Sequence, residues 1–111
     1  MSFLRIFLVA STVLIYALTA VAVKSHGFNW PAVAINDLLA LNWRTQFNTD
    51  FIVYLCIVAF WISWREGLTT KGHAFGLVSV VMGGMFSFPY ILHATYRANG
   101  DMRKVLLGVH A

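Results

Sequence analysis

The side chains best suited to chemistry in this sequence are one carboxylate, two phenols and one imidazole that stand among apolar residues. Asp50 and Tyr54 are four residues apart, so a helix places them on one face. If the helix that begins near Asp50 and the helix that ends near Arg97 are antiparallel, their polar ends lie at the same depth. We therefore predict a polar cluster of Asp50, Tyr54, Tyr90 and His93, with an ion pair between Asp50 and Arg97.

Three roles are open for this predicted cluster. An ionised carboxylate among apolar side chains costs about a few kcal/mol unless it meets a partner or reaches water. In the first role, a salt bridge or hydrogen bond within the cluster holds the helices together. In the second, the cluster is a proton-linked or ligand-binding site. In the third, Asp50 only extends its side chain to the membrane surface.

The other reactive residues form no recognisable catalytic or metal-binding pattern. The four histidines include no i,i+4 pair, and His73 and His93 would lie about 30 Å apart on one continuous helix. Cys56 is the single cysteine, which excludes a thiolate cluster within the chain. The sequence has no Gly-x-Ser-x-Gly, phosphate-binding loop or dinucleotide fingerprint. We expect neither a metal site nor enzymatic activity.

The composition predicts that membrane helices position these residues. Of the 111 residues, 59% are hydrophobic and only 11% are charged, and the mean hydropathy is +0.73. A water-soluble domain has about a quarter of its residues charged. The net charge of +4 is scattered over loops and ends, with no basic stripe, so we do not expect nucleic-acid binding. The positive charge instead concerns orientation in the membrane and anionic lipid head groups.

The hydropathy pattern divides the chain into five segments of one membrane domain, residues 1–111. Three apolar runs are long enough to cross a hydrocarbon core of about 30 Å as helices. The predicted fold is therefore all-α and integral to the membrane, with three transmembrane helices plus an amphipathic interfacial helix between the first and second. The segments are the spanning runs 6–23, 47–64 and 73–96, the interfacial helix 31–42 and the polar tail 97–111.

The boundaries of the first loop and the first run rest on local signals. Asn29 is the predicted cap of the interfacial helix and Pro31 lies in its first turn, where a missing N–H leaves no partner unsatisfied. The first run also has the features of a signal peptide, with Arg5 before it and the small residues Ala20 and Ala22 near its end. We expect a retained membrane helix.

Three crossings would place the N-terminus and the turn 65–72 on one side of the membrane. The segment 24–48 and the C-terminal tail would then lie on the other side, which carries five of the eight Lys and Arg residues. The positive-inside rule assigns that side to the cytoplasm. We therefore expect a cytoplasmic C-terminus.

Small residues in the third run predict a helix-packing face. In lipid, helices associate through close packing and hydrogen bonds, which small side chains permit. We expect this face to pack within the chain, with docking to another protein or a flat cofactor as the alternative. Proline in the same run should free the carbonyl near Met85 and bend the helix. The residues concerned are Gly76, Ser79, Gly83, Ser87 and Pro89.

Three short motifs carry a family resemblance over residues 28–97. They are Asn-Thr-Asp-Phe at 48–51, Phe-Trp-Ile-Ser-Trp-Arg-Glu-Gly at 60–67, and Ser-Phe-Pro-Tyr at 87–90 followed by Tyr-Arg at 96–97. With them the chain resembles the small bacterial membrane proteins of the domain of unknown function 2834 family. The resemblance implies a three-helix membrane protein with an interfacial segment, and it implies no activity. We expect a multi-pass protein of the bacterial inner membrane.

The function that the sequence favours is non-catalytic. A bundle this small buries little surface by itself, so we predict an accessory or structural subunit of a larger membrane complex of respiratory or photosynthetic type. The first alternative is a membrane module near Asp50, Tyr54, Tyr90 and His93 that contacts a lipid, quinone, carotenoid or tetrapyrrole. The second alternative is a minimal oligomeric transporter in which Asp50 couples to protons. The expected partners are a larger complex and lipids, and no cofactor is predicted to be essential.

Overall fold

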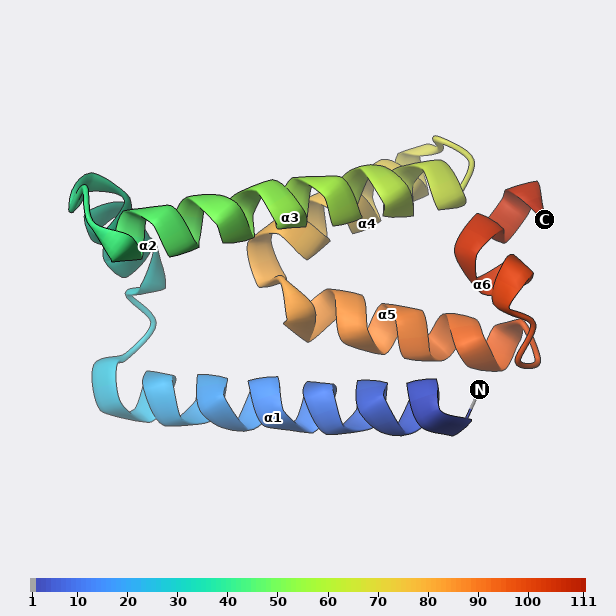
Figure 1. Cartoon of the computed structure of the whole chain (residues 1–111), viewed down its shortest axis with the longest axis horizontal. Helices are drawn as coiled ribbons and strands as arrows, with labels where there is room; N and C mark the ends of the chain where they lie inside the picture. The colour runs from blue at the N-terminus through green and yellow to red at the C-terminus, as the bar shows by residue number, and fades with distance from the viewer. Residues whose placement is uncertain (1) are drawn as a thin grey trace.

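The computed structural model describes residues 2–111, apart from the side chain of His26, so Met1 of the predicted domain lies outside it. The described residues form helices and no strand, which confirms the all-α prediction. Two helices are long and apolar enough to cross a membrane, α1 (Ser2–His26) and α3 (Trp43–Arg65). The other elements are α2 (Trp30–Leu39), α4 (Thr70–Met82), α5 (Gly84–Arg97), α6 (Met102–Leu107) and the 3-10 turn η1 (Gly108–His110) (Figure 1).

The surfaces of α1 and α3 are apolar around most of their circumference. Phe3 of α1 is 83% exposed and Phe60 of α3 is 75% exposed, whereas Leu8 and Ile62 are the buried apolar residues of these two helices. A helix that is apolar on nearly every side belongs in a protein core or in lipid. Since little of either helix is covered by the rest of the chain, both match a lipid environment.

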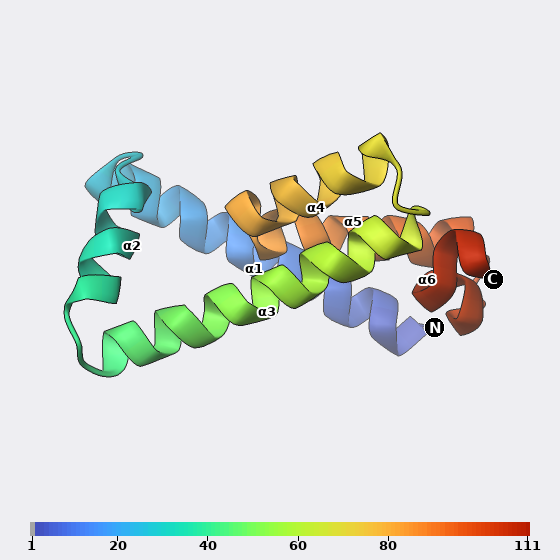
Figure 2. The same cartoon turned by 90° about the horizontal axis from the view of Figure 1, so that it is seen from above.

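The predicted helix over residues 73–96 is divided in the structure into α4 and α5, which meet at Gly83. α4 runs antiparallel to α3, and α5 then returns along α1 toward the end from which α4 came (Figures 1 and 2). The two helices have 13 and 14 residues, about 20 Å each, which is less than a hydrocarbon core of about 30 Å. A third membrane-spanning helix is therefore not confirmed.

The reversal at Gly83 also corrects the predicted placement of the tail. The C-terminus lies at the end of the bundle that holds the N-terminus, and the segment 24–48 lies at the opposite end (Figure 1). Gly83 has φ +61° and ψ −134°, a conformation that residues with a Cβ rarely adopt. Its N–H donates to Ser79 at the end of α4, and its carbonyl accepts from Phe86 and Ser87 at the start of α5. One glycine thus ends one helix and starts the next in a new direction.

Pro89 lies inside α5, and the carbonyl that it frees has a partner on α1. A proline cannot donate to the carbonyl four residues before it, here that of Met85. The hydroxyl of Tyr16 donates to this oxygen at 2.9 Å. Nearer the other end of α5, Arg5 of α1 donates to the carbonyl of Thr95 at 2.9 Å. These two bonds fix α1 against both ends of α5.

Replacing Tyr16 by Phe should destabilise the protein by about 1 kcal/mol, because the Met85 carbonyl would be left unpaired next to apolar surroundings. Unfolding in detergent measures the loss. Tyr54→Phe is the matched control, since Tyr54 is 63% exposed on α3 and should be neutral. Equal effects of the two substitutions would contradict the role given to the Tyr16 hydroxyl.

Small residues bring α4 into close contact with α3. A Cβ added to Gly76 would lie 2.7 Å from the hydroxyl of Ser63 and 2.9 Å from the carbonyl of Ala59. Ser79, one turn further along α4, is completely buried. The packing of Gly76 and Ser79 is therefore internal. Ser87 is buried on α5, and Gly83 forms the turn between the helices.

Gly76→Ala should cost about 1–3 kcal/mol, because the added methyl group meets backbone and cannot be accommodated without a shift of α4. Thermal unfolding in micelles is the measurement. Ala74→Val adds bulk to an exposed position of the same helix and serves as the control. A Gly76→Ala protein as stable as the Ala74→Val protein would show that α4 does not depend on this close approach.

The interfacial segment forms α2, which lies across the end of the bundle between α1 and α3 (Figure 2). It spans residues 30–39, shorter than the predicted 31–42, with Pro31 in its first turn. Asn29 occupies the cap position, but its side chain makes no capping bond. Asn42 instead caps α3, which therefore begins four residues before the predicted start of that span, at Trp43.

The predicted polar tail is folded. Asp101 caps α6 by accepting from the N–H of Arg103 at 3.0 Å. Val105 is 1% exposed and packs against Ala94 of α5 and against Ala98, the residue that caps the end of α5. His110 stacks on Trp64 at the end of α3, with ring centroids 4.1 Å apart. The segment after Arg97 therefore closes one end of the bundle.

Candidate functional site

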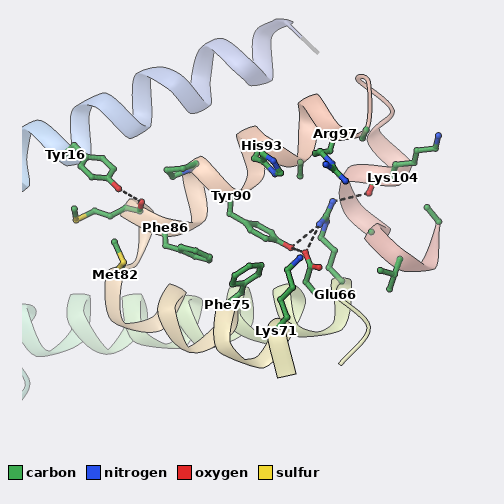
Figure 3. A pocket seen from close by; sticks show the side chains of 18 residues that line it. Tyr16, Glu66, Lys71, Phe75, Met82, Phe86, Tyr90, His93, Arg97 and Lys104 are labelled. Atoms are coloured by element: carbon green, nitrogen blue, oxygen red, sulfur yellow. Dashed lines mark hydrogen bonds and ion pairs between the residues drawn. The ribbon is translucent and has the colours of Figure 1, made fainter. Parts of the chain in front are cut away.

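One face of α5 lines a groove with a volume of about 830 Å³. The residues that α5 contributes recur every three or four positions, which is the period of one helix face: Met85, Phe86, Pro89, Tyr90, His93, Ala94 and Arg97. The other walls come from α1, from the end of α3 with Glu66, from α4 and from α6 with η1 (Figure 3). The hairpin and the folded C-terminal segment together create this groove, because the reversal at Gly83 brings α5 back to the end of the bundle where α6 lies.

A partly buried triad of Arg65, Glu66 and Tyr90 forms the inner wall of the groove. Tyr90 donates its hydroxyl hydrogen to Glu66 at 2.5 Å, and Arg65 donates to the same Glu66 oxygen at 3.2 Å and to the Tyr90 hydroxyl at 3.0 Å. The side chains of Arg65 and Glu66 are only 13% and 18% exposed. Charged groups with so little contact with solvent need this full set of partners.

Arg65 also holds the C-terminal segment. Its Nε donates to the carbonyl of Val105 at 2.6 Å and its Nη2 to that of Lys104 at 3.4 Å. These carbonyls belong to the end of α6, where a helix has unpaired acceptors and where a cation is favourable. Trp61 adds a bond from its indole N–H to the carbonyl of Leu106 at 3.0 Å.

Three further cations stand around the groove, one from each of its flanking elements: Lys71 at the start of α4, Arg97 at the end of α5 and Lys104 on α6. Glu66 is the carboxylate side chain among the lining residues, and Arg65 already neutralises it. The groove therefore carries an excess of positive charge on its outer side.

The opposite part of the groove is apolar. Phe75, Phe86 and Tyr90 form a cluster of three rings with centroid separations between 5.7 and 6.0 Å. Beyond them, toward the α4–α5 turn, the lining consists of Met82, Met85 and the ring of Tyr16. Figure 3 shows Met82 at one end of this space, Arg97 and Lys104 toward the other end, and Lys71 beside Phe75 and Glu66 on the wall across from Arg97.

The structure brings together only part of the predicted polar cluster. Tyr90, His93 and Arg97 line the groove, whereas Asp50 and Tyr54 are exposed on α3 away from it. Tyr90 contacts Arg65, and Asp50 precedes Arg65 by 15 residues, or about 22 Å along α3. The predicted Asp50–Arg97 ion pair is corrected for this reason: α5 runs opposite to the direction assumed. Within residues 2–111, the ion pairs are Arg44–Asp37 and Arg65–Glu66.

Sequence reasoning missed the groove residues outside the third run. At the level of the sequence, Arg65 and Glu66 are used only as part of the motif at 60–67, and Lys71 and Lys104 count only toward orientation in the membrane. The available signal was local: Asp101 is a helix cap followed by the apolar residues 105–107, which predicts a short packed helix rather than a tail.

No match to this chain was found among protein-family models, characterised proteins or solved structures. The resemblance to the domain of unknown function 2834 family, and the three-helix fold that it implies, therefore stays a prediction. Among the residues that the structure describes, no group of three or more His, Cys, Asp or Glu side chains is arranged to hold a metal ion.

Arg65→Leu should destabilise the protein by about 3 kcal/mol, because it leaves the partly buried Glu66 without its cation and removes the hydrogen bonds of Arg65 to the end of α6. Arg44→Leu is the control: Arg44 pairs with Asp37 at 3.7 Å, but its side chain is 65% exposed, so the expected cost is below about 1 kcal/mol. Unfolding in detergent gives the stability, and trypsin cleavage after Arg103 reports release of α6. Similar losses for both variants would refute the central role of Arg65.

Proposed function

We propose that this chain is a non-catalytic, multi-pass membrane protein that binds a lipid-like amphiphile in the groove between the α4–α5 hairpin and α6. In this proposal α1 and α3 cross the membrane, and the hairpin enters and leaves from one side. The observation that carries the proposal is the groove itself, which joins a cationic end to an apolar end within a single space of about 830 Å³.

The size and chemistry of the groove support a small-molecule ligand. Ligand sites in proteins have volumes of about 300–1,000 Å³ and are mostly apolar, with a few polar groups that fix orientation. Here Phe75, Phe86 and the methionines supply the apolar wall, and the Tyr90 hydroxyl and His93 supply polar groups. Methionine side chains adapt to flexible apolar chains because they are unbranched and polarisable.

An amphiphile suits this groove better than the other ligands expected from the sequence. A carotenoid lacks the charged group that the cationic end would favour. A tetrapyrrole bound to His93 would need space over the preceding turn, which is occupied by Pro89. A quinone fits the aromatic part but leaves the cations without a partner.

The charge distribution supports an orientation with both termini in the cytoplasm. Six of the eight Lys and Arg residues lie at the end of the bundle that holds the termini, and only Lys24 and Arg44 lie at the other end (Figure 1). The positive-inside rule favours the first end for the cytoplasm. The location in the bacterial inner membrane and the cytoplasmic position of the C-terminus stay predictions. The proposal adds that the N-terminus is also cytoplasmic.

The two other functions expected from the sequence have less support. For the accessory subunit, the small-residue face of the third run was one candidate docking surface, but Gly76 packs on α3 and Ser79 is completely buried. The transporter prediction placed Asp50 in a polar cluster, and Asp50 does not line the groove. Both stay predictions that rest on the sequence.

A lipid analogue with a diazirine in its acyl chain tests the proposal. The full chain, in detergent with native-like lipid, is illuminated with a phosphatidylglycerol or a phosphatidylcholine analogue, and labelled residues are mapped by mass spectrometry. We expect label on Met82, Met85 and Phe86 that unlabelled lipid displaces in a saturable manner. Label on the exposed residues Val13 and Phe60 should persist, because bulk lipid acts there as solvent. Unsaturable, uniform labelling with both head groups would refute the proposed function.

A further inference from the structure

Some charged side chains of the groove have an ion-pair partner and others have none. Arg65 and Glu66 neutralise each other and share Tyr90, so the triad contributes no net charge. For Lys71, Arg97 and Lys104, no ion pair is present within residues 2–111. Three exposed cations from three separate elements thus line one groove without an ion-pair partner, and this positive potential favours an anion in the groove.

We propose that the ligand of the groove carries an anionic head group, phosphate or carboxylate, that Lys71, Arg97 and Lys104 bind together. This inference rests on the proposed function and specifies its ligand: an anionic lipid of the leaflet that faces the termini. Arg97 can bind two oxygens of such a group at once through its planar fork, and the lysines act as compact cations.

The dimensions of the groove match one leaflet. From Arg97 to Phe86, α5 descends 11 residues, or about 16 Å, which is close to half of a hydrocarbon core of about 30 Å. A head group beside Arg97 therefore places its acyl chain along Tyr90 and Phe86, with the chain end near Met82 and Met85. The ammonium of Lys71 lies 5.4 Å from the centroid of the Phe75 ring, at the boundary between the charged and apolar parts.

The proposed orientation places this site where such lipids occur. Anionic lipids give the cytoplasmic leaflet a negative surface potential, which attracts basic residues at its surface. The same end of the bundle holds most of the basic residues of the chain, so the head group would enter a region of positive potential. Its binding should weaken as salt screens these exposed cations.

The decisive measurement compares competitors that share their acyl chains and differ in head group. Saturable groove labelling is displaced by phosphatidylglycerol or by phosphatidylcholine, and we expect the anionic lipid to be at least about 10-fold more effective. Inorganic phosphate alone should not displace the label at matched concentration. Equal competition by both lipids would overturn the anionic preference while leaving the proposed function intact, and displacement by phosphate alone would overturn the need for an acyl chain.

Neighbouring residues of α6 provide a matched pair of variants. Lys104 lines the groove and Arg103 does not. Lys104→Gln should weaken phosphatidylglycerol binding about 5-fold, and adding Lys71→Gln and Arg97→Gln should weaken it about 100-fold, whereas Arg103→Gln should have little effect. Phosphatidylcholine labelling of Phe86 in the same variants reports that the groove is still folded. Equal effects at positions 103 and 104, with the groove folded, would show a general surface potential instead of a site.

Discussion

The architecture depends on the guanidinium of Arg65. One planar group with five N–H donors reaches Glu66, the hydroxyl of Tyr90 and two carbonyls of α6, and so joins the end of α3 to α5 and to the C-terminal segment. A lysine could not make these bonds simultaneously, because its three donors leave a single atom. Without this junction, α6 would keep its apolar contact with Ala94 and Ala98 but would lose its polar link to α3 and Tyr90, and the groove would lose its inner wall.

Elsewhere the structure is held by contacts that remain favourable when lipid replaces water. Burial of apolar surface gives helices little reason to associate in lipid, so close backbone packing and interhelical hydrogen bonds matter more. The buried apolar residues are accordingly few: Leu8, Ile62, Ala94, Ala98 and Val105. The approach of Gly76 to Ala59, the bond from Tyr16 to Met85 and the bonds from Arg5 to Thr95 connect α4 to α3 and α1 to α5.

The sequence allowed correct prediction of those features that depend on local chemistry. The all-helical class, the long helices α1 and α3, the short helix that begins near Pro31 and the freed carbonyl near Met85 all follow from residue type and spacing. Hydropathy could not give the reversal at Gly83, because it measures preference for lipid and carries no information about direction. Because the prediction gave α5 the wrong direction, it placed Asp50 next to Arg97 and Tyr90 far from Arg65. The triad joins residues about 25 positions apart through a turn that has no apolar signature of its own.

The return of the hairpin to its starting side has a consequence for biosynthesis. In the proposed orientation, nothing after Arg65 has to be translocated, so Arg97, Arg103 and Lys104 stay in the compartment where the ribosome releases them. Carrying each such charge through hydrocarbon would cost several kcal/mol. The insertion machinery would thus insert only α1 and α3. The α4–α5 hairpin would then pack between these two helices afterwards, guided by the close fit of α4 on α3.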